Sequence, residues 1–163
     1  MANICRTEIK IIANKEAIKD FALRFENCVD GEYPNVNGDK HIIDEFGADA
    51  ELLIDRIGSK WVQMYDSYPY WKEGMTEYEF QLESAWYHPS DMMKEMYRQL
   101  TTIDPEAQME GRYWEETFDP IGVFKFVDGE LITNEESVEV DYDEEYYWDE
   151  QVEPVFDNLK NNL

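Results

Sequence analysis

Apolar and polar residues alternate along several stretches of the chain, which is the pattern expected of β-strands that bury one face. Residues 4–12 and 78–86 show it most clearly. On the polar parity of the second stretch stand Glu77, Glu79 and Glu83, so one face of this strand is expected to be core and the other nearly all carboxylate. Shorter apolar segments predict further strands, over 58–65, 107–118, 121–127 and 130–133.

Two segments change from this period of two to helical spacing. Apolar residues between Ile18 and Phe25 recur on one stripe, and Asn14 precedes them as a helix cap. A second apolar stripe begins after Pro89 and Ser90 and ends before Asp104 and Pro105. We therefore expect one helix directly after each of the two clearest strands.

The remaining segments are predicted from turn residues. Residues 30–39 are rich in Gly, Pro and Asn and are expected to form a loop. Residues 42–57 are expected to be short helical or irregular structure. Asp128 and Gly129 form a two-residue hairpin turn, and the residues after Pro154 are expected to pack as a helical turn.

The order of these elements predicts the fold class. Strand, helix, strand, strand, helix, strand is the split βαβ arrangement, so we expect an α+β protein with a ferredoxin-like βαββαβ antiparallel sheet and two helices on one face. A C-terminal acidic strand and helix are expected to extend it. The predicted organisation is a ferredoxin-like domain over residues 1–132 and an acidic extension over residues 133–163.

The extension carries the most informative pattern in the chain. No Lys or Arg lies between Lys125 and Lys160. Over residues 137–143 apolar side chains alternate with carboxylates, which predicts a strand that is apolar on one face and acidic on the other. Same-face residues of a strand are roughly 6.6–6.8 Å apart, and a nucleic-acid strand carries one phosphate per about 3.4 Å. The segment is therefore expected to imitate the charge row of a nucleic acid.

The overall charge is strongly negative, with 38 Asp and Glu against 14 Lys and Arg and a formal net charge of −24. High charge favours disorder only when apolar residues are few, and here 43% of residues are hydrophobic. We expect a folded protein that does not bind nucleic acid or an anionic membrane directly. The charge has a second explanation, solubility alone, which the sequence does not exclude.

No enzyme, cofactor or metal site is predicted. His88 and Asp91 stand three residues apart, but no nucleophile or phosphate loop accompanies them, which favours a capping or surface pair. The acids from Asp141 onward begin like a calcium loop, yet its required glycine is Tyr146. Two cysteines without metal-ligand spacing, no bilayer-spanning apolar run and no signal-peptide core indicate a cytoplasmic protein.

Residues 1–132 contain four short features that recur together in one protein family. They are Met1, Ala2, Asn3 and Cys5, the GVFKFVDGEL hairpin, and two motifs that consist of Gly58, Ser59, Lys60 and Trp61 and of Ser84, Ala85, Trp86 and Pro89. On these features, residues 1–132 resemble the YubB-type ferredoxin-like domain family of phage and plasmid proteins. The sequence departs from the family at Ile4, Val62, Tyr87 and His88. The resemblance implies a ferredoxin-like fold and a mobile-element origin, and it implies no settled activity. With the cytoplasmic location expected above, the protein is expected to act in the host cytoplasm.

The leading hypothesis is a phage-encoded inhibitor of a host defence complex, such as a CRISPR effector or restriction enzyme, that occupies its basic nucleic-acid channel. The alternative is a phage accessory protein that binds a host protein through its aromatic and acidic tail. The tail aromatics either contact that partner or only fix the tail to the domain. The expected partner-binding residues are Glu77, Glu79, Glu83, Glu135, Glu136, Glu139, Asp141, Asp143, Glu144, Glu145, Tyr146, Tyr147, Trp148, Asp149 and Glu150.

Overall fold

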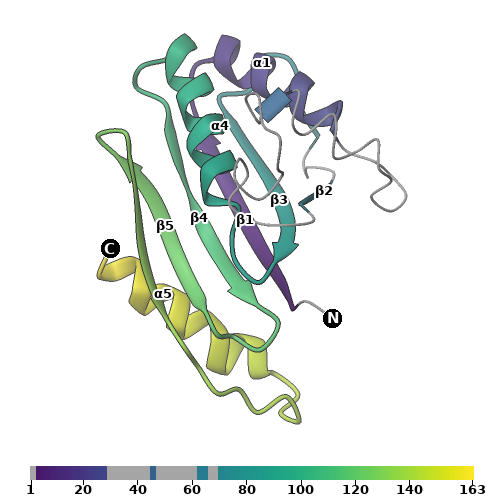
Figure 1. The fold of residues 1–163 in the computed structure, drawn as a ribbon, viewed down its shortest axis with the longest axis vertical. Helices are drawn as coiled ribbons and strands as arrows, with labels where there is room; N and C mark the ends of the chain where they lie inside the picture. The colour runs from purple at the N-terminus through teal and green to yellow at the C-terminus, as the bar shows by residue number, and fades with distance from the viewer. Residues whose placement is uncertain (1–2, 29–44, 47–61, 66–69) are drawn as a thin grey trace.

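A computed structural model describes residues 3–28, 45–46, 62–65 and 70–163. The expected loop over 30–39, most of the segment 42–57 and the motif of Gly58, Ser59, Lys60 and Trp61 lie outside these described residues. The described part confirms an α+β protein with a six-stranded antiparallel sheet, in the order β2-β3-β1-β4-β5-β6 (Figure 1). Among the described residues, no helix is both long and apolar enough to cross a bilayer.

As far as β6, the described elements follow the predicted sequence of strands and helices. They are β1 (Ile4–Ile12), α1 (Lys15–Glu26), β2 (Gln63–Tyr65), β3 (Glu77–Ala85), α4 (Ser90–Ile103), β4 (Gln108–Glu115), β5 (Ile121–Val127), β6 (Glu130–Glu136), the π-helical turn η1 (Trp148–Val152) and α5 (Glu153–Asn161). The Asn14 side chain caps α1 by accepting a hydrogen bond from the Ala17 amide at 2.9 Å. The Asp128–Gly129 turn joins β5 to β6 with φ values of 52° and 83°, as the two-residue hairpin requires.

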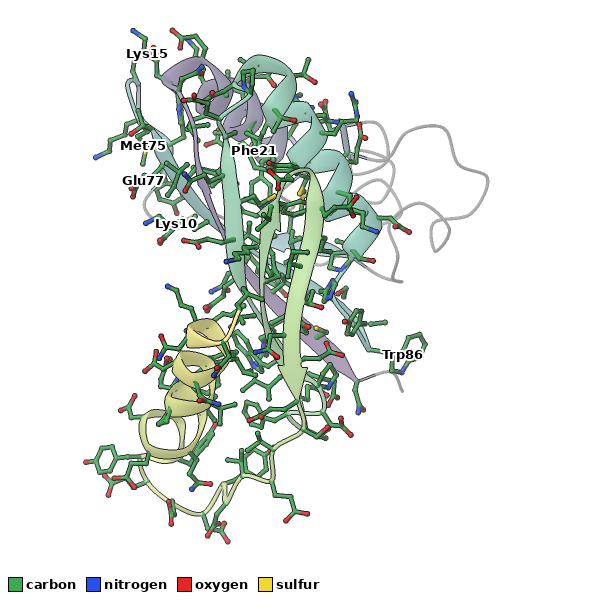
Figure 2. The ribbon with its side chains drawn as sticks, turned by 90° about the vertical axis from the view of Figure 1, so that its left-hand side faces the viewer. Lys10, Lys15, Phe21, Met75, Glu77 and Trp86 are labelled. Atoms are coloured by element: carbon green, nitrogen blue, oxygen red, sulfur yellow. The ribbon has the colours of Figure 1, made fainter. Side chains whose placement is uncertain are left out.

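The buried apolar residues of the described chain form two hydrophobic clusters. The larger one packs α1 and α4 against β1, β3 and β4, with the rings of Phe21 and Phe25 tilted against that of Phe80. The smaller one packs Phe156 and Leu159 of α5 against Trp114 of β4. Adjacent residues of a strand point to opposite faces of a sheet, and Tyr113 belongs to the larger cluster whereas Trp114 belongs to the smaller one. α5 therefore covers the face opposite to that covered by α1 and α4. Figure 2 shows α5 and α4 on opposite sides of the strands.

The prediction of an acidic strand over residues 137–143 is wrong. The sheet ends with β6 at Glu136, and residues 137–146 are extended chain and turns. Val138 and Val140 still point toward the smaller cluster, because they pack against it as partly buried residues. The Val138 amide donates to the carbonyl of Phe118 at 3.1 Å and not to a neighbouring strand. The chain turns over residues 142–146, so its carboxylates do not form the long regular row that a strand would give.

Phe156 should be the main attachment point of α5, because its side chain is only 3% exposed and lies against Trp114 and Trp148. We expect Phe156→Ala to lower the free energy of unfolding by about 3–5 kcal/mol, since it leaves a cavity in the smaller cluster. Urea titration measures the change. Asp157→Asn, at an exposed neighbouring position, is the control and should leave the midpoint nearly unchanged; equal midpoints for both variants would contradict this role.

Candidate functional site

Eight exposed carboxylates lie between the last residue of β6, Glu136, and the start of α5. We call this set the acidic surface. Within the described part of the chain none of its members has an ion pair within 4.0 Å, so their charge faces solvent uncompensated. It consists of Glu136, Glu139, Asp141, Asp143, Glu144, Glu145, Asp149 and Glu150.

Gln151 fixes the turn that presents these carboxylates. Its side-chain oxygen accepts a hydrogen bond from the Asp141 amide at 2.8 Å, and its side-chain nitrogen donates to Glu144 at 2.6 Å. The Asp141 carboxylate accepts from the Asp143 amide at 3.1 Å, which closes an Asx turn. The segment is irregular in its secondary structure, but these hydrogen bonds fix its backbone at Asp141 and Asp143 and the side chain of Glu144.

The four aromatic residues between positions 142 and 148 divide into two pairs. Tyr147 and Trp148 are half-buried and pack on the smaller cluster, with the Trp148 ring 5.2 Å from that of Trp114. Tyr142 and Tyr146 are 53% and 59% exposed. The first pair therefore fixes the tail to the sheet, and the second pair stands among the carboxylates with most of its surface available for contact.

Glu135 differs from the other predicted carboxylates. Its side chain accepts hydrogen bonds from the Tyr87 hydroxyl at 2.8 Å and from the buried Tyr113 hydroxyl. Burial, together with the adjacent Glu135 carboxylate, raises the pKa of Tyr87 to about 12. Glu135 thus connects β6 to the N-terminal end of α4, and this structural role separates it from the acidic surface.

Arg112 attaches the start of α5 to the sheet. Its guanidinium donates to Glu8 on β1 and, at 2.9 Å, to both carboxylate oxygens of Glu153. It also lies 4.7 Å from the Phe156 ring centre. Partial burial alone would lower the pKa of Arg112, but the two carboxylates raise it, so the charge persists at any ordinary pH.

The glutamates of β3 are neutralised to a large extent. Glu83 accepts from Arg6 at 3.0 Å and from the Tyr65 hydroxyl at 2.8 Å, and Glu77 pairs with Lys10 at 3.2 Å. Glu79 lies directly across from Lys10 in the ladder with β1. These side chains are on the surface, as predicted, but neighbouring cations balance them, so they do not extend the acidic surface.

A groove of about 740 Å³ runs between α5 and this part of the sheet. Charges of opposite sign alternate across its floor, since the ladder places Glu79, Lys10, Glu110 and Lys125 on successive strands. Opposite charges at cross-strand positions stabilise the sheet locally. The groove is therefore a region of matched charge, distinct from the acidic surface.

The interpretation of His88 and Asp91 as a capping or surface pair is wrong for His88. The imidazole is 1% exposed and packs between two rings, with centroids 4.0 Å from Tyr87 and 4.4 Å from Tyr113. The Oδ1 atom of Asp91 instead lies 3.9 Å from the Nζ atom of Lys94. Trp86, the family-motif residue next to this region, is 50% exposed and has a φ of 64°.

Sequence reasoning missed a set of buried polar residues on the strands next to Tyr113, whose ring contacts His88. Cys5, Ser84 and Glu115 stand side by side on β1, β3 and β4, and Thr7 stands beside Tyr113 in the next row. Thr7, Ser84, His88 and Glu115 are the buried polar residues of the described chain. The strand pattern showed Thr7 and Ser84 on the core parity, but the register that aligns them is not visible in sequence. In the described residues no three His, Cys, Asp or Glu side chains are grouped to hold a metal.

His88 should make the protein sensitive to acid. Burial, with a smaller effect of Lys94, lowers its pKa to about 4 from the ordinary 6.5. The folded state therefore favours neutral imidazole, and its contribution to stability is complete above pH 6.5 and is lost as the pH falls toward 4. Between pH 6.5 and pH 4 the free energy of unfolding falls by about 3 kcal/mol for this reason.

We expect His88→Phe, which keeps a ring between the two tyrosines, to remove this loss. Urea unfolding of the variant and the native protein from pH 7 to pH 4 measures it. As the pH falls from 7 to 4, the free energy of unfolding of the variant should rise by about 3 kcal/mol relative to that of the native protein. His41→Gln, at the other histidine of the chain, is the control. A constant difference between His88→Phe and the native protein at every pH would contradict the role of His88.

No protein-family model, curated protein or solved structure matches the chain. Membership of the YubB-type family, expected from the motifs of residues 1–132, stays a prediction. The function is therefore argued from the charge, exposure and hydrogen bonds described above, and the acidic surface with Tyr142 and Tyr146 is the candidate functional site.

Proposed function

We propose that this protein is a phage-encoded, non-enzymatic inhibitor whose acidic surface occupies the basic nucleic-acid channel of a host defence complex, such as a CRISPR effector or restriction enzyme. One observation carries the proposal: eight exposed carboxylates lie on a hydrogen-bonded segment, and in the described chain none of them is paired with a cation. The resemblance of residues 1–132 to phage and plasmid proteins supports the origin and the cytoplasmic site of action.

The proposal includes a ferredoxin-like arrangement for the first four strands. The strand order β2-β3-β1-β4 supports it, together with the helices α1 and α4 that follow β1 and β3. β5, β6 and α5 are then additions at one edge of that sheet. They carry the acidic surface, and a firm sheet beneath it reduces the conformational entropy lost on binding.

Inhibition would need no chemical step. Lys and Arg side chains of the partner would bind the carboxylates in place of phosphates, and the charge of −24 would accelerate the encounter. Because the carboxylates lie on a turn and not on a strand, they would match phosphates by their density and not by a regular repeat. Affinity for the partner should fall steeply with salt, as it does for many simultaneous ionic contacts.

A second candidate function is binding to a host protein without imitation of nucleic acid. The exposure of Tyr142 and Tyr146 favours it, since exposed aromatics supply much of the contact energy at protein interfaces. Affinity would then depend weakly on salt and strongly on these two rings. The salt dependence of binding distinguishes the two functions.

The charge proposal predicts the behaviour of a neutralised variant. Glu145→Gln, Asp149→Asn and Glu150→Gln remove three charges from the acidic surface at positions without a side-chain hydrogen bond in the described structure. The control has Glu16→Gln, Glu26→Gln and Glu106→Gln, which remove the same charge from exposed positions outside that surface. Both variants keep α5, whereas truncation after Thr133 would remove part of the core.

Binding is measured on immobilised protein with proteins captured from a host lysate, at low and high salt, followed by elution with duplex DNA. The first variant should lose at least tenfold in affinity at low salt, and the control should lose less than twofold. DNA should displace the captured partner. Equal losses for the two variants would indicate that charge serves solubility only, and retention of the partner in excess DNA would refute imitation of nucleic acid.

A further inference from the structure

The strand β6 forms an edge of the sheet. It pairs with β5 on one side and ends the strand order, and Figure 1 shows it beside β5 at the margin of the sheet. In the described chain, residues 130–136 make no backbone hydrogen bond outside the ladder with β5. An edge strand of this length presents a row of unpaired amides and carbonyls to a further strand.

The hairpin register identifies the groups that point outward. In a hairpin with a two-residue turn the residues that flank the turn form a hydrogen-bonded pair, here Val127 and Glu130. Pairs then alternate, so the amides and carbonyls of Leu131, Thr133 and Glu135 point away from β5. Thr133 is exposed and lies at the centre of this row.

The charges of β6 indicate what kind of strand could pair there. Two copies of β6 paired in antiparallel would set Glu130 against Glu136 at both ends, and like charges in direct opposition destabilise a sheet. A strand with Lys or Arg at those two positions would make two favourable pairs. Between these charges the edge has the β-branched residues Ile132, which is 40% exposed, and Thr133, which is also exposed.

We infer that β6 accepts an extended basic segment of the partner as an additional strand, with cationic residues opposite Glu130 and Glu136 and β-branched residues opposite the centre. This inference rests on the proposed function, because it supplies the binding geometry for the basic partner. Backbone pairing would fix the orientation of the partner beside the acidic surface, which begins at Glu136 and continues from the end of the same strand. Recognition by strand addition combines main-chain affinity with side-chain selectivity.

The test uses a synthetic peptide of the length of β6, acetyl-Lys-Val-Thr-Val-Val-Thr-Lys-amide. The matched control peptide has the same sequence and charge but carries N-methyl groups on the second, fourth and sixth amides. These groups remove the hydrogen bonds that the peptide would donate to β6, and their bulk keeps the two backbones apart. Binding is measured by calorimetry, and hydrogen exchange is measured for the amides of Leu131, Thr133 and Glu135. Thr133→Pro blocks the outward edge, and Thr133→Val is its control.

The inference predicts that the methylated peptide and the Thr133→Pro variant each weaken binding at least tenfold, and that the three outward amides become protected only with the unmethylated peptide. Thr133→Val should bind as the native protein does. Equal binding of the two peptides would overturn strand addition and leave the proposed charge-based docking intact. If neither peptide binds, strand addition is overturned as well. If Thr133→Pro does not fold, the peptide pair alone decides.

Discussion

Within the described chain, one ion pair joins the tail of this protein to the sheet, the contact between Arg112 and Glu153. The chain carries no cation from residue 126 to residue 159, and among the described residues only Glu153 of that range has an ion pair. The same guanidinium reaches Glu8 on β1 and lies over Phe156. It therefore couples the sheet, the start of α5 and the smaller hydrophobic cluster. Burial of Phe156, Leu159 and Val152 then holds α5 against the mutual repulsion of the carboxylates that precede it.

Much of the fold could be predicted from local pattern. The alternation of residues 4–12, the Asn14 cap and the Asp128–Gly129 turn each specify their own structure, and all three are confirmed. Residues 137–143 show the limit of the same reasoning. Val138 and Val140 are apolar because they fit a cluster made by α5, not because a neighbouring strand pairs with them. A period of two shows that alternate side chains are buried, but it does not show that the backbone has a partner.

The candidate site was predicted in part for the same reason. The acidic surface and its aromatics follow from composition, but the environment of each carboxylate depends on contacts distant in sequence. Glu135 accepts a hydrogen bond from Tyr113, which is 22 residues away in sequence, and Glu83 accepts one from Arg6, which is 77 residues away. The sequence already placed Arg6 and Lys10 on the polar parity of β1. Only the register with β3 shows that they neutralise Glu83 and Glu77, so the acidic face expected for β3 is largely balanced.

The arrangement of charge also bears on how the protein would respond to its proposed partner. Balanced charges cover β1 and β3, whereas unbalanced charges gather on one segment that follows β6. Repulsion within that segment raises the free energy of the folded tail, and salt or a cationic partner lowers it. A partner that binds the folded tail and not the unfolded chain must stabilise the fold by mass action. The hydrophobic contacts of α5 are therefore what allow the carboxylates to stay concentrated in the absence of a partner, and a chain with a weaker smaller cluster would need the partner in order to keep its tail in place.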